Sequence, residues 1–279
     1  TSCTSLTVGL SGAGTYYVAV GSSSSYGAPS GSYTVVASYS TDTSGIELEP
    51  NDTLATAQSV SLDESVVGTV SSSSDVDVFA LSASGAGTLT VGMTTKDISQ
   101  YSSYGFAYVV TDADGNTLAS DSCTTSCTSL TVGLSGAGTY YVAVGSSSSY
   151  GAPSGSYTVV ASYSTDVDGI EVEPNNEVAS AQPLKIGETI EGDLSDSVDV
   201  DIFEISIVNP GLLSAVFTTS GYTESSGGSF KYQILDSNSE ILAADYCGQD
   251  CRILQVGVGI SGTYFIRVES DTKNAKPDG

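Results

Sequence analysis

The sequence predicts an all-β protein built from tandem antiparallel β-sandwich domains, and three observations carry this prediction. Apolar and polar residues alternate in short runs such as Leu130, Val132 and Leu134. Turn-forming stretches such as the DADGN at 112–116 separate those runs. The whole pattern also repeats with a period of 124 residues, which is the size of one domain. We expect almost no helix, with one turn at most around 53–58.

The repeat sets the expected domain boundaries. Residues 1–42 recur letter for letter at 125–166, and the same offset aligns Phe79 with Phe203. The expected domains are the C-terminal part of a truncated repeat at 1–42, a complete β-sandwich repeat at 46–163, and a repeat lacking its last strand at 170–279. The connectors between them are short, so neighbouring domains should sit close together.

Charge excludes several classes of function. The 279-residue chain has 7 Lys and Arg against 32 Asp and Glu, no His, and a formal net charge of −25. Nucleic-acid binding needs clustered basic residues, so it is not expected. Direct membrane insertion is not expected either, because no apolar run approaches the ~20 residues of a membrane span. Without His there is no Ser-His-Asp triad, and we predict no enzyme activity.

The cysteines form pairs once the repeat is applied. Cys123 and Cys127 have the same spacing as Cys247 and Cys251, and Cys3 corresponds to Cys127 with its partner position outside the chain. A redox or metal site is the alternative, but the spacing is not that of a CxxC dithiol and no His or basic residue lies beside these cysteines. Two hairpin-closing disulfides are therefore predicted, in a protein that is secreted or displayed on the cell surface.

Acidic residues gather at each predicted domain start, in IELEPNDT at 46–53 and IEVEPNNE at 170–177. Alternation places Glu47 and Glu49 on one side of an extended segment. It also places Asp75 and Asp77 on the face of the core residue Phe79, past the rim of the sandwich. Acids that converge at one rim repel each other unless a cation is bound, and oxygen ligands without His or thiolate favour calcium (Ca²⁺). The alternative is that these acids are merely solvated at an exposed edge.

The candidate metal ligands belong to both repeats. They are Glu47, Glu49, Asn51, Asp52, Asp75 and Asp77 in the first set, and Glu171, Glu173, Asn175, Asn176, Asp199 and Asp201 in the second.

Three motifs in order, ExEPNDT, GxVxxxxDVDVF and GTYYVAV followed by YTVVASY, resemble the bacterial pre-peptidase C-terminal domain. The resemblance covers each 124-residue unit and extends to the related collagen-binding domains of clostridial collagenases. It implies a jelly-roll-like β-sandwich attached to secreted proteases and surface proteins. It also implies calcium coordination by the start segment and the downstream acids, with Thr69 or Asp193 as further ligands.

The chain also departs from those relatives. Ser74 and Val198 stand where the collagen-binding relatives have an acid, and their aromatic collagen-contact surface has no match here. Collagen binding is therefore not implied.

The expected function is a non-catalytic extracellular structural or adhesive role, as a segment of a long stalk, filament or matrix array that calcium rigidifies at the domain starts. The verbatim repeat favours it, because an array gains reach from copy number. The alternative is an accessory or substrate-binding C-terminal module of a secreted hydrolase such as a protease. The expected partners are neighbouring repeats or subunits in an extended polymer, with strand 33–39 either completed by a continuous chain or donated to a partner. A surface glycan or protein ligand is left open.

Overall fold

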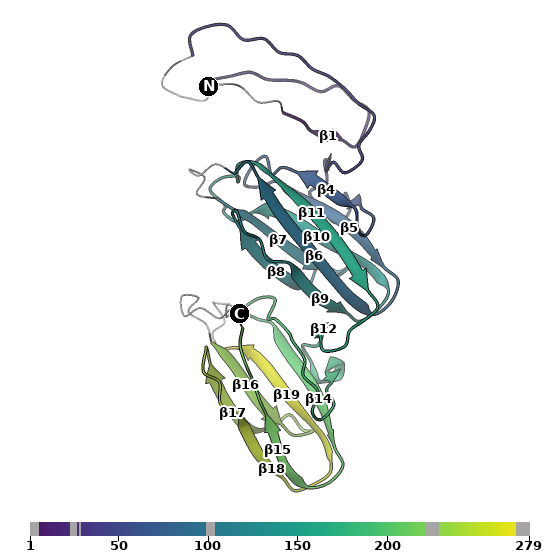
Figure 1. Ribbon diagram of the computed structural model, residues 1–279, viewed down its shortest axis with the longest axis vertical. Coiled ribbons are helices and arrows are strands. Elements are labelled where there is room, and N and C mark those ends of the chain that lie inside the picture. Colours follow the sequence, from purple (N-terminus) through teal and green to yellow (C-terminus); the bar gives the residue numbers. More distant parts are fainter. Residues whose placement is uncertain (1–5, 23–26, 28, 99–103, 221–228, 272–279) are drawn as a thin grey trace.

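The computed structural model describes residues 6–22, 27, 29–98, 104–220 and 229–271. Figure 1 shows three parts in a row: an N-terminal segment (residues 6–42), a central sandwich (46–164) and a C-terminal sandwich (170–271). Both sandwiches are built of strands, so the all-β prediction is confirmed. The only helix among the described residues is the 3-10 turn η1 (Val178–Ser180). No helix in this part of the chain is long and apolar enough to cross a membrane.

The central sandwich packs two five-stranded sheets against each other. The first contains, in spatial order, β3 (Gln58–Ser59), β5 (Val76–Ala83), β10 (Gly138–Ser146), β7 (Phe106–Thr111) and β8 (Thr117–Cys123). The second contains β9 (Leu130–Leu134), β6 (Gly87–Lys96), β11 (Ser156–Ser164) and β4 (Ser65–Gly68), and β12 (Val172–Glu173) of the next repeat joins it beside β9. Central strands pair antiparallel, whereas the two-residue edge strands β3 and β12 pair in parallel, so the sheets are mixed.

The C-terminal sandwich repeats this arrangement with fewer strands. Its larger sheet contains β13 (Gln182–Pro183), β14 (Val200–Ile207), β19 (Gly262–Ser270), β16 (Phe230–Leu235) and β17 (Ile241–Cys247). The facing sheet contains only β15 (Gly211–Ala215) and β18 (Leu254–Val258). Strands β5 and β14 begin at Val76 and Val200, which is the 124-residue offset of the sequence repeat.

The core follows the alternation of the sequence. Phe106, Tyr108 and Val110 on β7 are fully buried, and so are Val142 and Val144 on β10. On β19, the charged Arg267 predicts that its side of the strand faces solvent, and this is wrong for Phe265 on the same side. Phe265 is buried with Ile202 and Leu235 in a small second cluster on the outer face of the sheet. The alternation of side chains along one strand does not predict this cluster, because its residues come from three strands.

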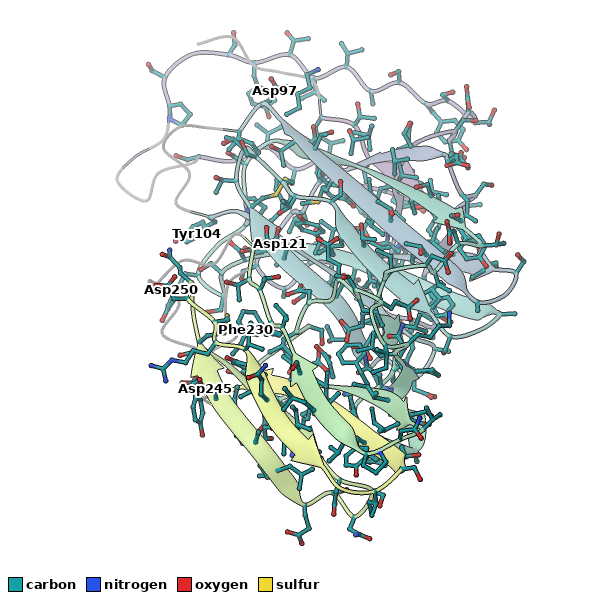
Figure 2. The ribbon with its side chains drawn as sticks, turned by 60° about the horizontal axis from the view of Figure 1, so that its bottom comes forward. Asp97, Tyr104, Asp121, Phe230, Asp245 and Asp250 are labelled. Atoms are coloured by element: carbon teal, nitrogen blue, oxygen red, sulfur yellow. A yellow bond between two sulfur atoms is a disulfide. The ribbon has the colours of Figure 1, made fainter. Side chains whose placement is uncertain are left out.

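Both expected disulfides are present, Cys123–Cys127 and Cys247–Cys251. Each closes the loop after β8 or β17. A buried tyrosine ties the same loop to the core: the Tyr108 hydroxyl donates to Thr128 O, and the Tyr232 hydroxyl to Arg252 O at 2.7 Å. Figure 2 labels Asp121 of β8, which also accepts a hydrogen bond from Tyr108 (3.1 Å), and its counterpart Asp245 on β17. Cys3 lies outside the described residues.

Candidate metal centre

Hydrogen bonds that do not involve its carboxylates hold the start segment of the central sandwich (residues 46–53) in place. Gln58 clamps it from both sides: its Oε1 accepts from Leu48 N–H (2.7 Å), and its Nε2 donates to Ile46 O (3.0 Å). The Glu47 N–H also donates to Val67 O at 2.9 Å. These bonds hold β2 (Leu48–Glu49) extended, so that Glu47 and Glu49 project toward β5. Sequence reasoning missed Gln58, although its repeat counterpart Gln182 makes the same two hydrogen bonds.

Three carboxylates converge at this place. One oxygen each of Glu47, Glu49 and Asp77 lies within 4.8 Å of the others. Glu47, Asp77 and the adjacent Asn51 are buried. Glu47 Oε1, Asp77 Oδ1 and both polar side-chain atoms of Asn51 have no hydrogen-bond partner. Buried polar atoms are almost always paired, so this group of orphaned oxygens fits a bound cation.

The electrostatics point the same way. Burial, followed by the charges of Asp77 and Glu49, raises the pKa of Glu47 to about 8. Burial also raises the pKa of Asp77 to about 7, and a hydrogen bond from Tyr157 opposes that rise. The pKa of Glu49 is raised by burial and then by the charge of Asp75. Without a cation, the cluster therefore keeps protons near neutral pH, where isolated carboxyls have already released theirs.

Tyr157 is a member of this site that the sequence analysis did not identify. It lies on β11, the last strand, and its buried hydroxyl donates to Asp77 Oδ2 at 2.6 Å. Gly68 makes room for it, because a Cβ at that position would lie 2.3 Å from the Tyr157 hydroxyl. The first and last parts of the sandwich thus meet at the acidic cluster.

The remaining candidates lie beside the cluster. Asp75 is buried and accepts from Ser71 N–H, which shapes the loop before β5. Asp52 is exposed and accepts from Val76 N–H at 3.4 Å. In the second repeat Asp199 is buried and accepts from Ser195 N–H, whereas Asn176 is exposed. Among the described acidic candidates, the two Glu and the second Asp of each set are the ones whose oxygens lie within 4.8 Å of one another.

The second cluster consists of Glu171, Glu173 and Asp201, all buried. Burial and neighbouring acids raise the pKa of Glu173 to about 8 and that of Asp201 well above its ordinary range. Glu171 accepts from Asn175 Nδ2 (2.7 Å) and from Asp193 N–H (3.0 Å). Glu173 Oε1, Asn175 Oδ1 and Asp201 Oδ1 have no hydrogen-bond partner, so this site also presents unsatisfied oxygens.

Each acidic segment also pairs with the repeat that precedes it. β12 lies parallel to β9 of the central sandwich, with Gly133 N–H donating to Glu171 O at 3.0 Å. The short strand β1 (Gly9–Leu10) lies beside β2 in the same way. A Cβ at Gly133 would lie 2.1 Å from Glu171 O, and a Cβ at Gly9 would lie 2.1 Å from Glu47 O. The backbone of the acidic start segment therefore forms the junction between repeats, and glycine is required opposite it.

A second contact supports the junction between the central and C-terminal sandwiches. Ser120 Oγ on β8 donates to Ser195 O at 2.8 Å, and Ser195 Oγ donates to Thr117 O at 3.3 Å. Ser195 is itself held by Asp199. An acid beside the second cluster thus helps to position the contact with the preceding sandwich.

No protein-family model matches the chain, and none of the curated proteins compared with it is similar. Among solved structures it is similar to the pre-peptidase C-terminal domain of collagenase from Bacillus anthracis, at 15% identity and a TM-score of 0.30, over 38% of this chain and 93% of that one. It is also similar to tripeptidyl peptidase 2, at 10% identity and a TM-score of 0.27, over 75% of this chain and 20% of that one. A human MASP-1/3 CUB1-EGF-CUB2 domain aligns at 8% identity with a TM-score of 0.22, over 73% of this chain and 90% of that one. The likeness to the first is weak, and the family resemblance remains a prediction from the motifs.

Proposed function

We propose that this chain is a non-catalytic extracellular spacer whose repeats, 46–163 and 170–279, bind calcium where one repeat joins the next. The observation that carries the proposal is that one short segment does two things in each repeat. Its Glu side chains form the buried acidic cluster, and its backbone pairs with the preceding repeat. A cation that orders the segment therefore stiffens the junction.

Calcium suits the available ligands better than other common ions. The clusters offer carboxylate oxygens together with the amide of Asn51 or Asn175, and neither His nor thiolate is present in them. Zinc prefers nitrogen and sulfur ligands, and magnesium retains several waters in a strict octahedron. Glu47, Glu49 and Asp77 would hold the ion in the central repeat, with Glu171, Glu173 and Asp201 in the next. The bound charge would allow these carboxyls to ionise together.

The disulfides support the proposed location. Disulfides persist in secreted and surface-exposed proteins and are rare in the cytosol. Two are formed in the described residues, one per sandwich. The repeated junction geometry supports a structural or adhesive role in a stalk, filament or matrix. The alternative role as a module of a secreted hydrolase stays a prediction.

Isothermal titration of the whole chain with CaCl₂, MgCl₂ and ZnCl₂ tests the proposal. We expect calcium to bind at both clusters with preference over the other ions, and small-angle scattering to show a better-defined length when calcium is added. Asp77→Asn and Asp201→Asn should each remove one site. Glu240→Gln is the matched control, because it removes an exposed carboxylate from the turn between β16 and β17, at the end of the sheet opposite Asp201. Calcium binding that survives both cluster substitutions would refute the site.

A further inference from the structure

The second acidic cluster is formed by two separate pieces of chain, and each piece contacts the central sandwich. Glu171 and Glu173 belong to the start segment, which pairs as β12 with β9 (Figure 1). Asp201 lies at the beginning of β14, and the loop that leads into this strand, residues 193–199, contains the junction residue Ser195. The relative position of the ligand oxygens therefore depends on how both pieces lie against the preceding repeat.

The contact made by this loop depends on one side chain of the central sandwich. Ser120 Oγ on β8 donates to Ser195 O at 2.8 Å, and Ser195 Oγ donates in return to Thr117 O at 3.3 Å. Ser195 is 3% exposed, whereas its repeat counterpart Ser71, which makes no such contact among the described residues, is exposed. Contact with the central sandwich is therefore what buries Ser195.

On its other side, the same loop is bonded to the acidic cluster. The Ser195 N–H donates to Asp199 Oδ2, and the Asp193 N–H donates to Glu171 Oε2 at 3.0 Å. Asp199 is buried, and after burial its charge is the largest cause of the raised pKa of Glu173. Hydrogen bonds thus connect β8 of the central sandwich, through this loop, to the acids of the second cluster.

The serine on β8 is not a requirement of the sandwich fold itself. The C-terminal sandwich has Ala244 at the position of Ser120, and β17 pairs with β16 there as β8 pairs with β7. The pairing of this strand therefore does not depend on a hydroxyl at that position. In the central sandwich, the hydroxyl contributes to the junction with the next repeat.

We propose that Ser120 is a positioning residue for the calcium site of the following repeat, so that the central sandwich sets the calcium affinity of the second cluster. The inference rests on the proposed function, because it takes calcium to be the ion that this cluster binds. Docking of the loop on Ser120 orders the two ligand pieces before the ion arrives, and ligands ordered in advance bind with a smaller loss of conformational entropy. Linkage makes the effect reciprocal: calcium at this cluster strengthens the docking of the two sandwiches by the same factor.

Calorimetric titration with CaCl₂, in full chains that keep one site each, tests this role. In the Asp77→Asn chain, which keeps the second cluster, we expect Ser120→Ala to weaken calcium binding roughly tenfold, which is about 1.4 kcal/mol and the size of one hydrogen bond. In the Asp201→Asn chain, which keeps the central cluster, the same change should leave the affinity unaltered. Ser120 belongs to the central sandwich, so a general loss of stability there would weaken the central cluster rather than the second.

Ser122→Ala is the matched control. Ser122 lies two residues further along β8 on the same face, it is exposed, and no hydrogen bond joins its hydroxyl to the described part of the C-terminal sandwich. Both clusters should keep their affinity in this variant. Ser195→Ala removes the bond to Thr117 O but keeps the backbone bonds, so it should weaken the second cluster by a smaller factor, whereas Ser71→Ala should not.

Two results would overturn the inference. One is that Ser120→Ala leaves the affinity of the second cluster unchanged, and the other is that it lowers the affinity of both clusters equally. Either result leaves the proposed function standing, because calcium still binds the parent chains. An Asp77→Asn chain that binds no calcium would instead refute the proposed function at the second cluster, and the inference with it.

Discussion

The Tyr157 hydroxyl donates a hydrogen bond of 2.6 Å to Asp77 Oδ2, across 80 residues of sequence and between two sheets of the sandwich. The bond joins the last strand of the repeat to an acidic cluster formed by its first segments. It favours the ionised form of Asp77, because a donor to a carboxylate lowers its pKa. The last strand of the repeat and the ionisation of the acidic cluster are therefore linked by one contact.

Removing this hydroxyl should weaken calcium binding. Tyr157→Phe leaves the ring in the core but leaves Asp77 Oδ2 without its donor, which costs about 1–3 kcal/mol for a buried acceptor. We expect a lower melting temperature and weaker calcium affinity by calorimetry. Tyr163→Phe is the control: it lies on the same strand, but its hydroxyl donates to Gly85 O and Ala86 O, away from the cluster. Equal losses of calcium affinity in both variants would contradict the link.

Calcium-free protein should become less stable as pH rises. Glu47 and Glu173 titrate at about 8 in the folded state against an ordinary value of 4.5, and Asp77 at about 7 against 3.8. At pH between the ordinary and the raised pKa of each group, the folded state binds more protons than the unfolded state. Each retained proton therefore lowers stability by up to about 1.4 kcal/mol per pH unit as pH rises. This loss of stability is absent at pH below the ordinary pKa values and complete at pH above the raised pKa values.

Thermal melts in chelator from pH about 5 to about 8 measure this dependence. At saturating calcium the ligands are ionised in the folded state, so the decline should disappear. Calcium affinity should rise over the same window, because protons compete with the ion. A calcium-free melting temperature that climbs with pH would show that the acids do not interact as the structure indicates.

The alternation of the sequence predicted the buried faces well, because a period of two is a local property of each strand. Leu130, Val132 and Leu134, the alternating run named from the sequence, are buried. The same logic failed for Phe265, whose face carries a cluster contributed by three strands. The internal repeat was equally informative, since it aligned strands, cysteines and acidic segments without any structural input.

The parts of the site that the sequence did not predict depend on contacts between segments that are distant in the sequence. Gln58 clamps the start segment from ten to twelve residues away, and Tyr157 reaches Asp77 from the last strand. The backbone pairing between Gly133 and Glu171 depends on how two repeats meet. Residue spacing encodes none of these distances. A comparison of the repeats does preserve a hint, since Gln58 and Gln182, and Gly9 and Gly133, recur at the same offset.

The disulfides should stabilise their own hairpins more than the whole chain. Cys123 and Cys127 enclose so small a loop that the chain-entropy contribution is roughly 2 kcal/mol. We expect the Cys123→Ser, Cys127→Ser double variant to lose about that much stability and to keep both metal sites. Non-reducing mass spectrometry should find both pairs oxidised and Cys3 unpaired within the chain. A cross-linked peptide that joins the central and C-terminal sandwiches would contradict the pairing.

The junction between repeats should depend on glycine at position 133. Gly133→Ala places a methyl group 2.1 Å from Glu171 O, so β9 and β12 must separate, at a cost of about 1–3 kcal/mol for overpacking. We expect faster hydrogen exchange at the Gly133 amide, which donates to Glu171 O, and a wider range of lengths in small-angle scattering even with calcium present. Gly136→Ala is the matched control, because a Cβ there meets nothing within 4 Å. The carboxylates of Glu171, Glu173 and Asp201 are not altered, so calcium should still bind, and this separates a flexible junction from a lost metal site. If the variant kept the exchange protection and length distribution of the wild type, the parallel pairing would not be what holds the repeats together.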